Sequence, residues 1–309
     1  MSSTRPARRP EWLRVRLRTG ESYRRLRSMV SELSLNTVCT EARCPNIYEC
    51  WNAGTATFMI LGDTCTRRCG FCNVKSGRPE TGVDPLEPQH VGQAVARLGL
   101  QHAVITSVDR DDLADGGARH FADVIRAVRD HAPGCAVEVL TPDFKNRPGA
   151  LETVLAARPE VFAHNVETVP RLYRKARPGS RYSGSVELLS RAAERRDRDM
   201  PRLRVKSSLM LGLGEHDDEV LDVMRDLRAA GVDVVTLGQY LQPTAQHLPV
   251  ERFVHPSEFA SFRETGMAMG FLHVESGPLV RSSYHAERHR PDPPPGPHTD
   301  SASTALPVL

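Results

Sequence analysis

Short apolar runs alternate with amphipathic stretches along most of this 309-residue chain. Six runs have the length and character of buried strands: Thr57–Leu61, Ala103–Ser107, Ala136–Leu140, Val161–His164, Val205–Leu211 and Val234–Leu237. The stretches that follow them have helical periodicity: Val91–Leu98, Ala118–His131, Ala150–Ala157, Val186–Arg196, Glu219–Ala230 and Pro256–Met269. Strands that alternate with helices in this way predict a parallel sheet with helical crossovers.

Six strand–helix units are too few to close an eight-stranded barrel. The sequence therefore predicts an α/β fold, an open, partial (β/α)6 TIM-type barrel over residues 53–275, with its functional site at the carboxyl ends of the strands. We expect an N-terminal extension, residues 1–52, and a C-terminal segment, residues 276–286, to cover the barrel mouth. Residues 287–309 are expected to be a disordered Pro-rich tail.

Hydropathy and the start of the chain bear on where the protein works. No apolar stretch approaches the length needed to span a bilayer, so no membrane partner is expected. Residues 1–18 contain Arg throughout and lack the apolar core of a secretory signal. An Arg-rich start is compatible with a mitochondrial presequence, but Glu11 and Glu21 weaken that alternative. We therefore expect a cytoplasmic protein.

Six of the seven cysteines lie between residues 39 and 72, which indicates metal or redox chemistry rather than a disulfide scaffold. Cys65, Cys69 and Cys72 form a CxxxCxxC motif in the loop after the first predicted strand. Thiolates suit iron–sulfur clusters or zinc. Three of them can hold three irons of a cubane cluster and leave the fourth iron open to a small molecule with an amine and a carboxylate. The alternative is a zinc knuckle with a distant fourth ligand.

A second trio, Cys39, Cys44 and Cys50, lies just upstream. Six thiolates exceed the four ligands that one zinc ion or one cubane cluster uses. Two separate clusters are therefore the economical interpretation. The remaining cysteine, Cys135, is expected to be a buried structural thiol.

The motifs resemble those of a known family. The CxxxCxxC loop, with Phe71 directly before its third cysteine, resembles the signature of the radical S-adenosylmethionine (SAM) superfamily. The two trios in this order are similar to those of the lipoyl synthase family, and Arg281-Ser282-Ser283-Tyr284 resembles that family's RSSY motif. The resemblance covers roughly residues 10–286, with one departure at Ala163, where the family usually has Asn. Other similar stretches are Pro10–Leu13, Gly20–Glu21, Asp109–Leu113, Asp115–Gly117, Leu140–Phe144, Arg171–Tyr173, Arg177–Gly179 and Gly238–Pro243.

This resemblance implies two 4Fe–4S clusters and SAM as cofactors. The cluster on the CxxxCxxC trio would cleave SAM to a 5′-deoxyadenosyl radical. The auxiliary cluster on Cys39, Cys44 and Cys50 would take a serine oxygen as its last ligand, from Ser283 or alternatively Ser282. Arg281 and Ser283 are the implied catalytic residues.

The implied reaction inserts two sulfur atoms at C6 and C8 of an octanoyl chain on a lysine of a lipoyl carrier protein, and the auxiliary cluster is the sulfur donor. The implied partners are octanoylated lipoyl carrier domains, an electron donor such as ferredoxin or flavodoxin, and an iron–sulfur cluster assembly or carrier protein. No nucleic acid is expected.

Polar residues and glycines after the predicted strands are candidate SAM contacts. Asn165 and Glu167 follow the fourth strand and are expected to bind the ribose hydroxyls or the methionyl amine; a helix N-cap is the alternative. Gly212 and Gly214 end the fifth strand, where glycine lets the backbone approach a ligand; a tight turn is the alternative. Phe71 is expected to contact the same cofactor.

Two charged groups lie near the predicted site. Asp109, Asp111, Asp112 and Asp115 either start a helix and stay solvated or, with Arg110, line the substrate entrance. Arg171, Arg174, Lys175 and Arg177 are either a solvated face or a docking surface for an acidic carrier domain. The formal net charge of +3 discriminates poorly between an acidic protein and a nucleic acid.

Two other functions are compatible with parts of the pattern. A methylthiotransferase acting on transfer RNA would also carry two clusters, but would need a longer separate domain and a nucleic-acid-binding module. A zinc-stabilised binding protein would need no iron. No histidine pair has ligand spacing, so no catalytic histidine is expected.

Overall fold

The main sheet of the protein is open and mostly parallel. The computed structural model describes residues 9–14, 46–52 and 56–291, together with 20, 24, 27, 28, 32 and 35–37. The strands of the sheet are β1 (Asn36–Thr37), β2 (Ala56–Ile60), β5 (His102–Ser107), β6 (Ala136–Leu140), β7 (Val161–Ala163), β8 (Arg204–Leu211), β9 (Val234–Gln239) and β10 (His273–Gly277). They lie in this order, and only β1 is antiparallel to its neighbour. A separate ribbon contains β3 (Thr64–Cys65) and β4 (Lys75–Ser76).

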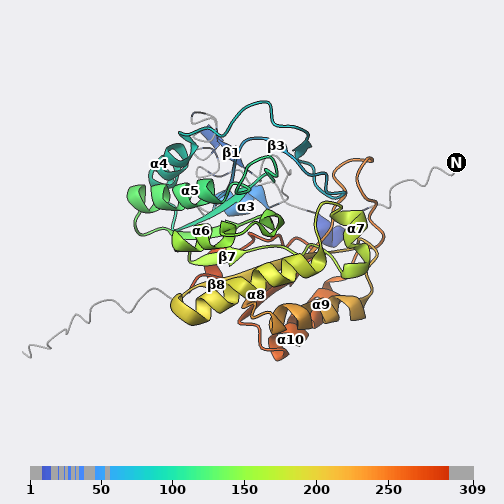
Figure 1. Ribbon diagram of the computed structural model, residues 1–309. Coiled ribbons are helices and arrows are strands. Elements are labelled where there is room, and N and C mark those ends of the chain that lie inside the picture. Colours follow the sequence, from blue (N-terminus) through green and yellow to red (C-terminus); the bar gives the residue numbers. More distant parts are fainter. Residues whose placement is uncertain are drawn as a thin grey trace, which may run out of the picture.

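Six helices cover the outside of the sheet (Figure 1). They are α4 (Glu87–Leu98), α5 (Ala118–His131), α6 (Ala150–Ala156), α8 (Tyr182–Asp199), α9 (Asp217–Ala229) and α10 (Pro256–Ala268). Shorter elements are α3 (Ile47–Asn52), α7 (Tyr173–Ala176) and the 3-10 turns Glu11–Leu13, Phe144–Asn146, Pro170–Leu172 and Ala286–Arg288. The six predicted strand–helix units and the open α/β barrel are confirmed. Within the described part of the chain, no helix is both long and apolar enough to cross a membrane.

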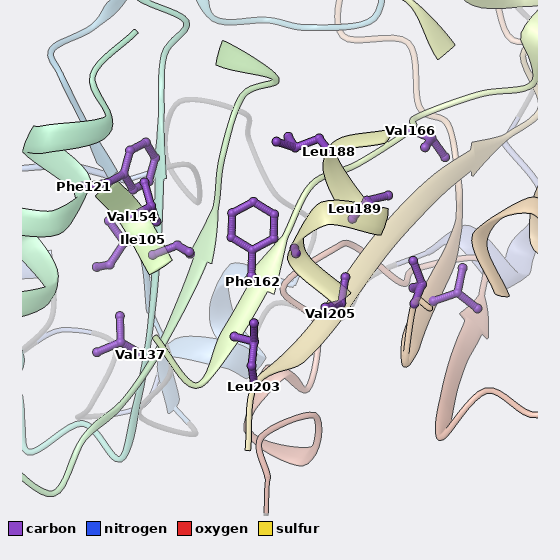
Figure 2. Packing of buried hydrophobic residues seen from close by; sticks show 14 of the residues in the cluster. Ile105, Phe121, Val137, Val154, Phe162, Val166, Leu188, Leu189, Leu203 and Val205 are labelled. Carbon is purple, nitrogen blue, oxygen red and sulfur yellow. The ribbon is translucent and has the colours of Figure 1, made fainter. Parts of the chain in front are cut away.

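The hydrophobic core lies between the strands and these helices. Every residue of β2 and β9 is buried, as are all but the last of β5. Figure 2 shows Ile105, Val137, Phe162 and Val205 from four strands packed with helix residues such as Leu189. Because a parallel sheet is covered on both faces, its strands read as continuous apolar runs, which is why they were predictable from the sequence.

The sequence does not predict the seventh parallel strand, β10. It contains one buried apolar residue, Val274, and therefore lacks the apolar run of the other strands. The barrel boundary predicted at residue 275 falls inside this strand, which continues to Gly277. Among the described residues, no ladder joins β10 to β1 or β2, so the barrel is open on this side.

The predicted disordered tail starts too early at residue 287. Ala286–Arg288 forms a 3-10 turn, and His289 has no exposed surface. A buried side chain holds the segment here, and the Pro-rich run begins only at Pro291. Residues 292–309, and residues 38–45 with Cys39 and Cys44, lie outside the described residues.

Candidate active site at the carboxyl ends of the strands

The parallel register brings the strand-to-helix loops to one edge of the barrel. Ile60 lies opposite Ser107, and Leu140 lies opposite Ala163. The chain leaves β2 through Leu61 and Gly62, which both have positive φ, and enters the CxxxCxxC loop. Most of the predicted site residues therefore follow strands that end side by side.

The CxxxCxxC loop is fixed to the loop after β5. Thr66 donates from its N–H and its hydroxyl to the Asp109 carbonyl oxygen, each at 2.9 Å. The Thr66 hydroxyl accepts from the Asp111 N–H at 3.0 Å. These bonds place Cys65 against Asp109: the Cys65 Sγ accepts from the Asp109 N–H at 3.4 Å and lies 3.7 Å from the Asp109 carboxylate.

The three thiols of this loop are half-buried, free and close to one another. Burial, followed by the Asp109 carboxylate, raises the pKa of Cys65 to about 11. Burial also raises the pKa of Cys69 to about 12 and raises the pKa of Cys72. Cys72 lies near enough to Cys65 and Cys69 for its charge to raise the pKa of each. All three are therefore neutral thiols at pH 7 until a bound metal supplies the positive charge that makes them thiolates.

The donor set fits an iron–sulfur cluster. It consists of three soft sulfurs in a water-poor loop, and backbone N–H groups point at two of them: those of Arg67 and Asp109 at Cys65 and that of Val74 at Cys72. Such hydrogen bonds to sulfur are one way in which proteins set the potential of these clusters. Within the residues described, no three His, Cys, Asp or Glu side chains converge on the position of a single metal ion.

A buried arginine inside the motif, Arg67, fastens the loop to two other strand ends. Its guanidinium donates to both carboxylate oxygens of Asp111 at 2.9 Å, to Asp143 at 2.6 Å and to the Ser180 hydroxyl at 2.8 Å. Burial would raise the pKa of Asp143, but the hydrogen bonds from Arg67 outweigh it and hold that pKa well below its usual range. Arg67 was not predicted as a site residue from the sequence. Its position between Cys65 and Cys69, two expected cluster ligands, is the feature that could have identified it.

Asn165 and Glu167 lie beside this loop. The Asn165 amide donates to the Glu167 carboxylate at 3.1 Å, and its Oδ1 atom is buried without a hydrogen-bond partner in the described structure. Glu167 has a φ of 68° and bridges to β8 opposite Leu209. Burial raises the pKa of Glu167, while Arg177 acts in the opposite direction. The Glu167 charge also acts on Cys69 and Cys72, so this pair faces the cysteine trio.

A second buried arginine, Arg177, supports this pair. Its Nη1 atom donates to the Asn165 carbonyl at 2.7 Å and to the Tyr173 hydroxyl at 2.9 Å. His164 is braced by the Thr141 carbonyl and by Ser185, each at 2.9 Å. Burial, and then Arg177, lower the pKa of His164 to about 4, so it is a neutral positioning side chain. From the sequence, Arg177 could be seen only as one of several basic residues, because its contacts with Asn165 and Tyr173 form in the folded chain.

Gly212 and Gly214 make the turn after β8, with φ of 100° and 105°. A Cβ atom at Gly212 would lie 2.3 Å from the Gln239 amide nitrogen and 2.5 Å from the Arg252 carbonyl oxygen. The buried Glu215 carboxylate accepts the N–H of Gly212 at 2.5 Å. The chain itself therefore requires glycine at 212, and contact of either glycine with a cofactor stays a prediction.

Phe71 is half-buried and packs against the core next to the segment after β9. That segment braces the cysteine loop. Leu248 donates from its N–H to the Gly70 carbonyl at 2.9 Å, and the His247 ring lies 2.9 Å from the Cys72 carbonyl oxygen. Sequence reasoning missed His247 because it contacts the backbone of the motif and has no ligand spacing with another histidine.

The third auxiliary cysteine, Cys50, lies in α3 beside the C-terminal segment. Asn46 donates to the Leu279 carbonyl at 2.6 Å, and the Tyr284 hydroxyl donates to Glu49 at 3.1 Å. Burial, then Glu49 and more weakly Cys50, raise the pKa of Tyr284 to about 12. Residues more than 230 positions apart thus meet here. The structure brings Cys50 to the RSSY motif, in which Arg281, Ser282 and Ser283 are half-buried.

The acidic group after β5 has mostly structural roles. Asp115 accepts the N–H groups of Gly117 and Arg119 at 2.9 and 2.8 Å, which caps α5. Arg110 is buried between the Leu61 carbonyl, at 3.2 Å, and Asp112. The helix-starting alternative holds for Asp115, and Arg110 braces the turn after β2.

The predicted basic cluster does not form one surface. Arg177 is buried, and Arg171 makes a two-bond ion pair with Glu219 at 2.8 and 2.7 Å. Arg174 and Lys175 are exposed. The sequence could not separate these roles because all four basic residues lie within one short stretch.

Solved structures with a similar fold include a protein bound to a precursor peptide and a synthase. The chain matches the Streptococcus suis SuiB structure bound to the precursor peptide SuiA with a TM-score of 0.56 and 11% identity, over 82% of this chain and 52% of that one. It matches methylornithine synthase (PylB) with a TM-score of 0.51 and 16% identity, over 82% of each chain. At this identity the likeness shows the fold alone.

Sequence comparison is far more specific. Residues 59–237 match the Radical SAM superfamily, and residues 2–44 match the N-terminal domain of lipoyl synthase. The chain is 57% identical to the lipoyl synthase of Rubrobacter xylanophilus, over 92% of this chain and 87% of that protein. It is 56% identical to that of Thermus thermophilus, over 91% and 86%. The chain therefore belongs to the lipoyl synthase family of the radical SAM superfamily.

Proposed function

We propose that this protein is a lipoyl synthase. It inserts two sulfur atoms at C6 and C8 of a protein-bound octanoyl-lysine, with an auxiliary 4Fe–4S cluster as the sulfur donor. Enzymes of its superfamily use SAM and a 4Fe–4S cluster. The observation that carries the proposal is the placement of two separate sulfur-bearing sites: the CxxxCxxC loop at the strand ends, and Cys50 beside the RSSY segment.

In the first site, Cys65, Cys69 and Cys72 would hold the cluster that, when bound, supplies the electron for cleavage of SAM. The Glu167 carboxylate and the unpaired Asn165 Oδ1 atom are the acceptors for the SAM amine or ribose hydroxyls. The buried Asn165 acceptor supports this role because an unpaired buried oxygen is costly unless a ligand or water satisfies it. Phe71, Gly212 and Gly214 complete the proposed cofactor contacts.

In the second site, Cys39, Cys44 and Cys50 would share the auxiliary cluster with Ser283, or alternatively with Ser282. An alkoxide is a harder ligand than a thiolate, so it suits an iron that must be released when sulfur is given up. Arg281 lies on the same turn, where its guanidinium donates to the Val280 carbonyl at 2.6 Å. We propose that it acts with Ser283 at this site.

The proposal assigns different segments of the chain to the two cluster sites. Residues 1–52 carry the auxiliary cysteines, the barrel from residue 53 carries the radical site, the RSSY segment lies within 276–286, and a Pro-rich tail follows. The partners are octanoylated lipoyl carrier domains, a ferredoxin or flavodoxin, and a cluster assembly or carrier protein, without nucleic acid or membrane. A reducing cytoplasm suits the two cysteine trios, which would have to remain available as cluster ligands.

The experiment is a single turnover with isotopically labelled cluster sulfide. Full-length protein is reconstituted with labelled sulfide, freed of excess sulfide, and mixed with SAM, a reductant and an octanoylated carrier domain. Mass spectrometry of the carrier should find the label in the new dithiolane, because the cluster is the only sulfide source. Unlabelled lipoyl product would contradict the sulfur source, and a carrier that stays octanoylated would contradict the activity.

A further inference from the structure

A cluster of buried ionisable side chains lies inside the barrel, away from the proposed site. His102, Glu138 and Lys206 are each at most 2% exposed. Lys206 Nζ lies 2.8 Å from one Glu138 oxygen, and His102 Nε2 lies 3.4 Å from the other. His102 is the first residue of β5, so the cluster lies toward the amino ends of the strands, where barrel residues serve stability rather than chemistry.

The fourth member of this cluster, His289, comes from the C-terminal segment. It has no exposed surface, and burial followed by the charge of Lys206 lowers its pKa to about 3, so it is inserted as a neutral imidazole. Its ring centroid lies 5.8 Å from that of His273, and its Nε2 atom lies 4.0 Å from Glu275 in β10. Neither ring nitrogen has a hydrogen-bond partner in the described structure.

The same segment also contacts the opposite side of the barrel. Arg290 donates to the Gln101 carbonyl, just before β5, at 3.4 Å. The 3-10 turn Ala286–Arg288 packs against β5. Since β5 and β10 are separated by four strands in the sheet, a segment that contacts both crosses between parts of the sheet that are not neighbours. Residues 286–290 therefore bridge the amino ends of β10 and β5.

The segment from Leu279 to His289 is held at both ends, and the RSSY motif lies between them. At one end, Asn46 holds the Leu279 carbonyl and Glu49 holds the Tyr284 hydroxyl. At the other end, His289 is the buried anchor. Ser283 is six residues from His289, a distance that the chain spans with about 20 Å at most. Any shift of the anchor is thus passed on to Ser283, because only two turns of tight backbone separate them.

We propose that His289 is a positioning residue whose insertion into the His102–Glu138–Lys206 cluster holds Ser283 beside Cys50. What Ser283 does there rests on the proposed function. Burying an imidazole without hydrogen-bond partners next to an ion pair costs free energy, which an apolar side chain at this position would not cost. This cost supports a positioning role for His289. Water that bridges His289 and His102 to Glu138 would satisfy these atoms in a polar interior of this kind.

The test compares three variants of the full chain: His289→Ala, His289→Gln, and Arg288→Ala as the matched control on the exposed side of the same turn. Amide hydrogen exchange is first measured on protein without clusters. In His289→Ala, exchange over residues 279–291 should be faster by about tenfold or more, with no change over residues 61–76. His289→Gln should restore part of the protection, and Arg288→Ala should match the unaltered chain.

The loaded enzymes then give the functional part of the test. In His289→Ala, iron retained by the auxiliary site and sulfur insertion should fall by about ten- to a hundredfold, while SAM cleavage stays near the unaltered rate. In a double variant with Ser283→Ala, His289→Ala should have little further effect on auxiliary iron and sulfur insertion, because His289 acts through that serine.

Unchanged exchange over residues 279–291 would overturn the proposal, and so would an equal loss of SAM cleavage and sulfur insertion, which indicates a general role in the core. If the unaltered enzyme makes no lipoyl product, the proposed function fails, whereas the exchange result still decides whether His289 anchors the segment.

Discussion

The two sulfur-bearing regions of this molecule are held in different ways. The CxxxCxxC loop is bound to the loops after β5, β6, β7 and β9 by Arg67, Thr66 and Gly70, through buried and half-buried hydrogen bonds. The C-terminal segment meets α3 and the residue before it through hydrogen bonds that include Asn46 to Leu279 and Tyr284 to Glu49. The proposed radical site is thus built into the barrel, whereas the proposed sulfur-donor site is formed by two segments from opposite ends of the chain. The second kind of support would suit a cluster that is taken apart in each turnover, as we propose for the sulfur donor.

The largest expected effect separates the two cysteine trios. Replacement of Cys65, Cys69 or Cys72 by Ala should abolish SAM cleavage and lipoyl formation together, because each removes a ligand of the first cluster. Cys50→Ala should leave SAM cleavage in place and stop sulfur insertion. Both are measured by chromatography of 5′-deoxyadenosine and mass spectrometry of the carrier.

Cys135→Ala is the matched control, since Cys135 is a buried cysteine outside both trios. It should keep both activities. If Cys50→Ala lost SAM cleavage as fully as Cys65→Ala, the two regions would not have separate roles.

The next effect tests how much Arg67 stabilises the fold around the CxxxCxxC loop. Arg67→Gln leaves three carboxylates without their buried partner, so the free energy of unfolding should fall by about 3–5 kcal/mol. Denaturant unfolding of the full chain measures it. Arg126→Gln, which breaks the exposed pair with Asp123, should cost less than about 1 kcal/mol. Equal effects would show that the Arg67 clamp is no stronger than a surface ion pair.

A third effect concerns SAM itself. Asn165→Ala and Glu167→Gln each remove an acceptor for the cofactor, and the dissociation constant of SAM should rise by about tenfold or more for each. Calorimetric titration of the reconstituted protein measures it. Glu219→Gln, in the exposed ion pair with Arg171, is the control and should bind SAM as the unaltered chain does. Unchanged affinity in both site variants would remove this pair from the cofactor site.

The last effect is a pH dependence of stability. Folding lowers the pKa of His164 to about 4 and that of His289 to about 3, so the unfolded chain binds more protons than the folded chain below about pH 6.5. Stability should therefore fall as the pH drops from 6.5 to 5, with each histidine contributing up to about 1.4 kcal/mol per pH unit. His289→Gln should reduce this slope and leave the part due to His164. Identical slopes in denaturant unfolding would place His289 outside the buried cluster.

The sequence predicted the parts of the fold that depend on local pattern. Strand β6 coincides with the predicted Ala136–Leu140, where apolar residues stand on both sides of the single charged Glu138. Strand β10 was missed because Val274 is its one buried apolar residue, so it lacks the apolar pattern of the other strands. The cysteine spacing pointed to the proposed radical site without any structure.

The supporting residues of the site could not be predicted in the same way. Arg67 is followed by the exposed Arg68, and Arg177 is near the exposed Arg174, so the chain looks uniformly basic at both places. Only the buried carboxylates of Asp111, Asp143 and Glu167, brought in from other loops, separate a clamp from a surface charge. This information lies in tertiary contacts and not in sequence spacing.

We propose that this chain binds two separate iron–sulfur clusters. Elemental analysis of full-length protein, reconstituted and purified without oxygen, should therefore find about eight iron atoms and about eight sulfides per chain, two clusters of four. Zinc in place of iron, or only about four irons per chain in the unaltered protein, would contradict it.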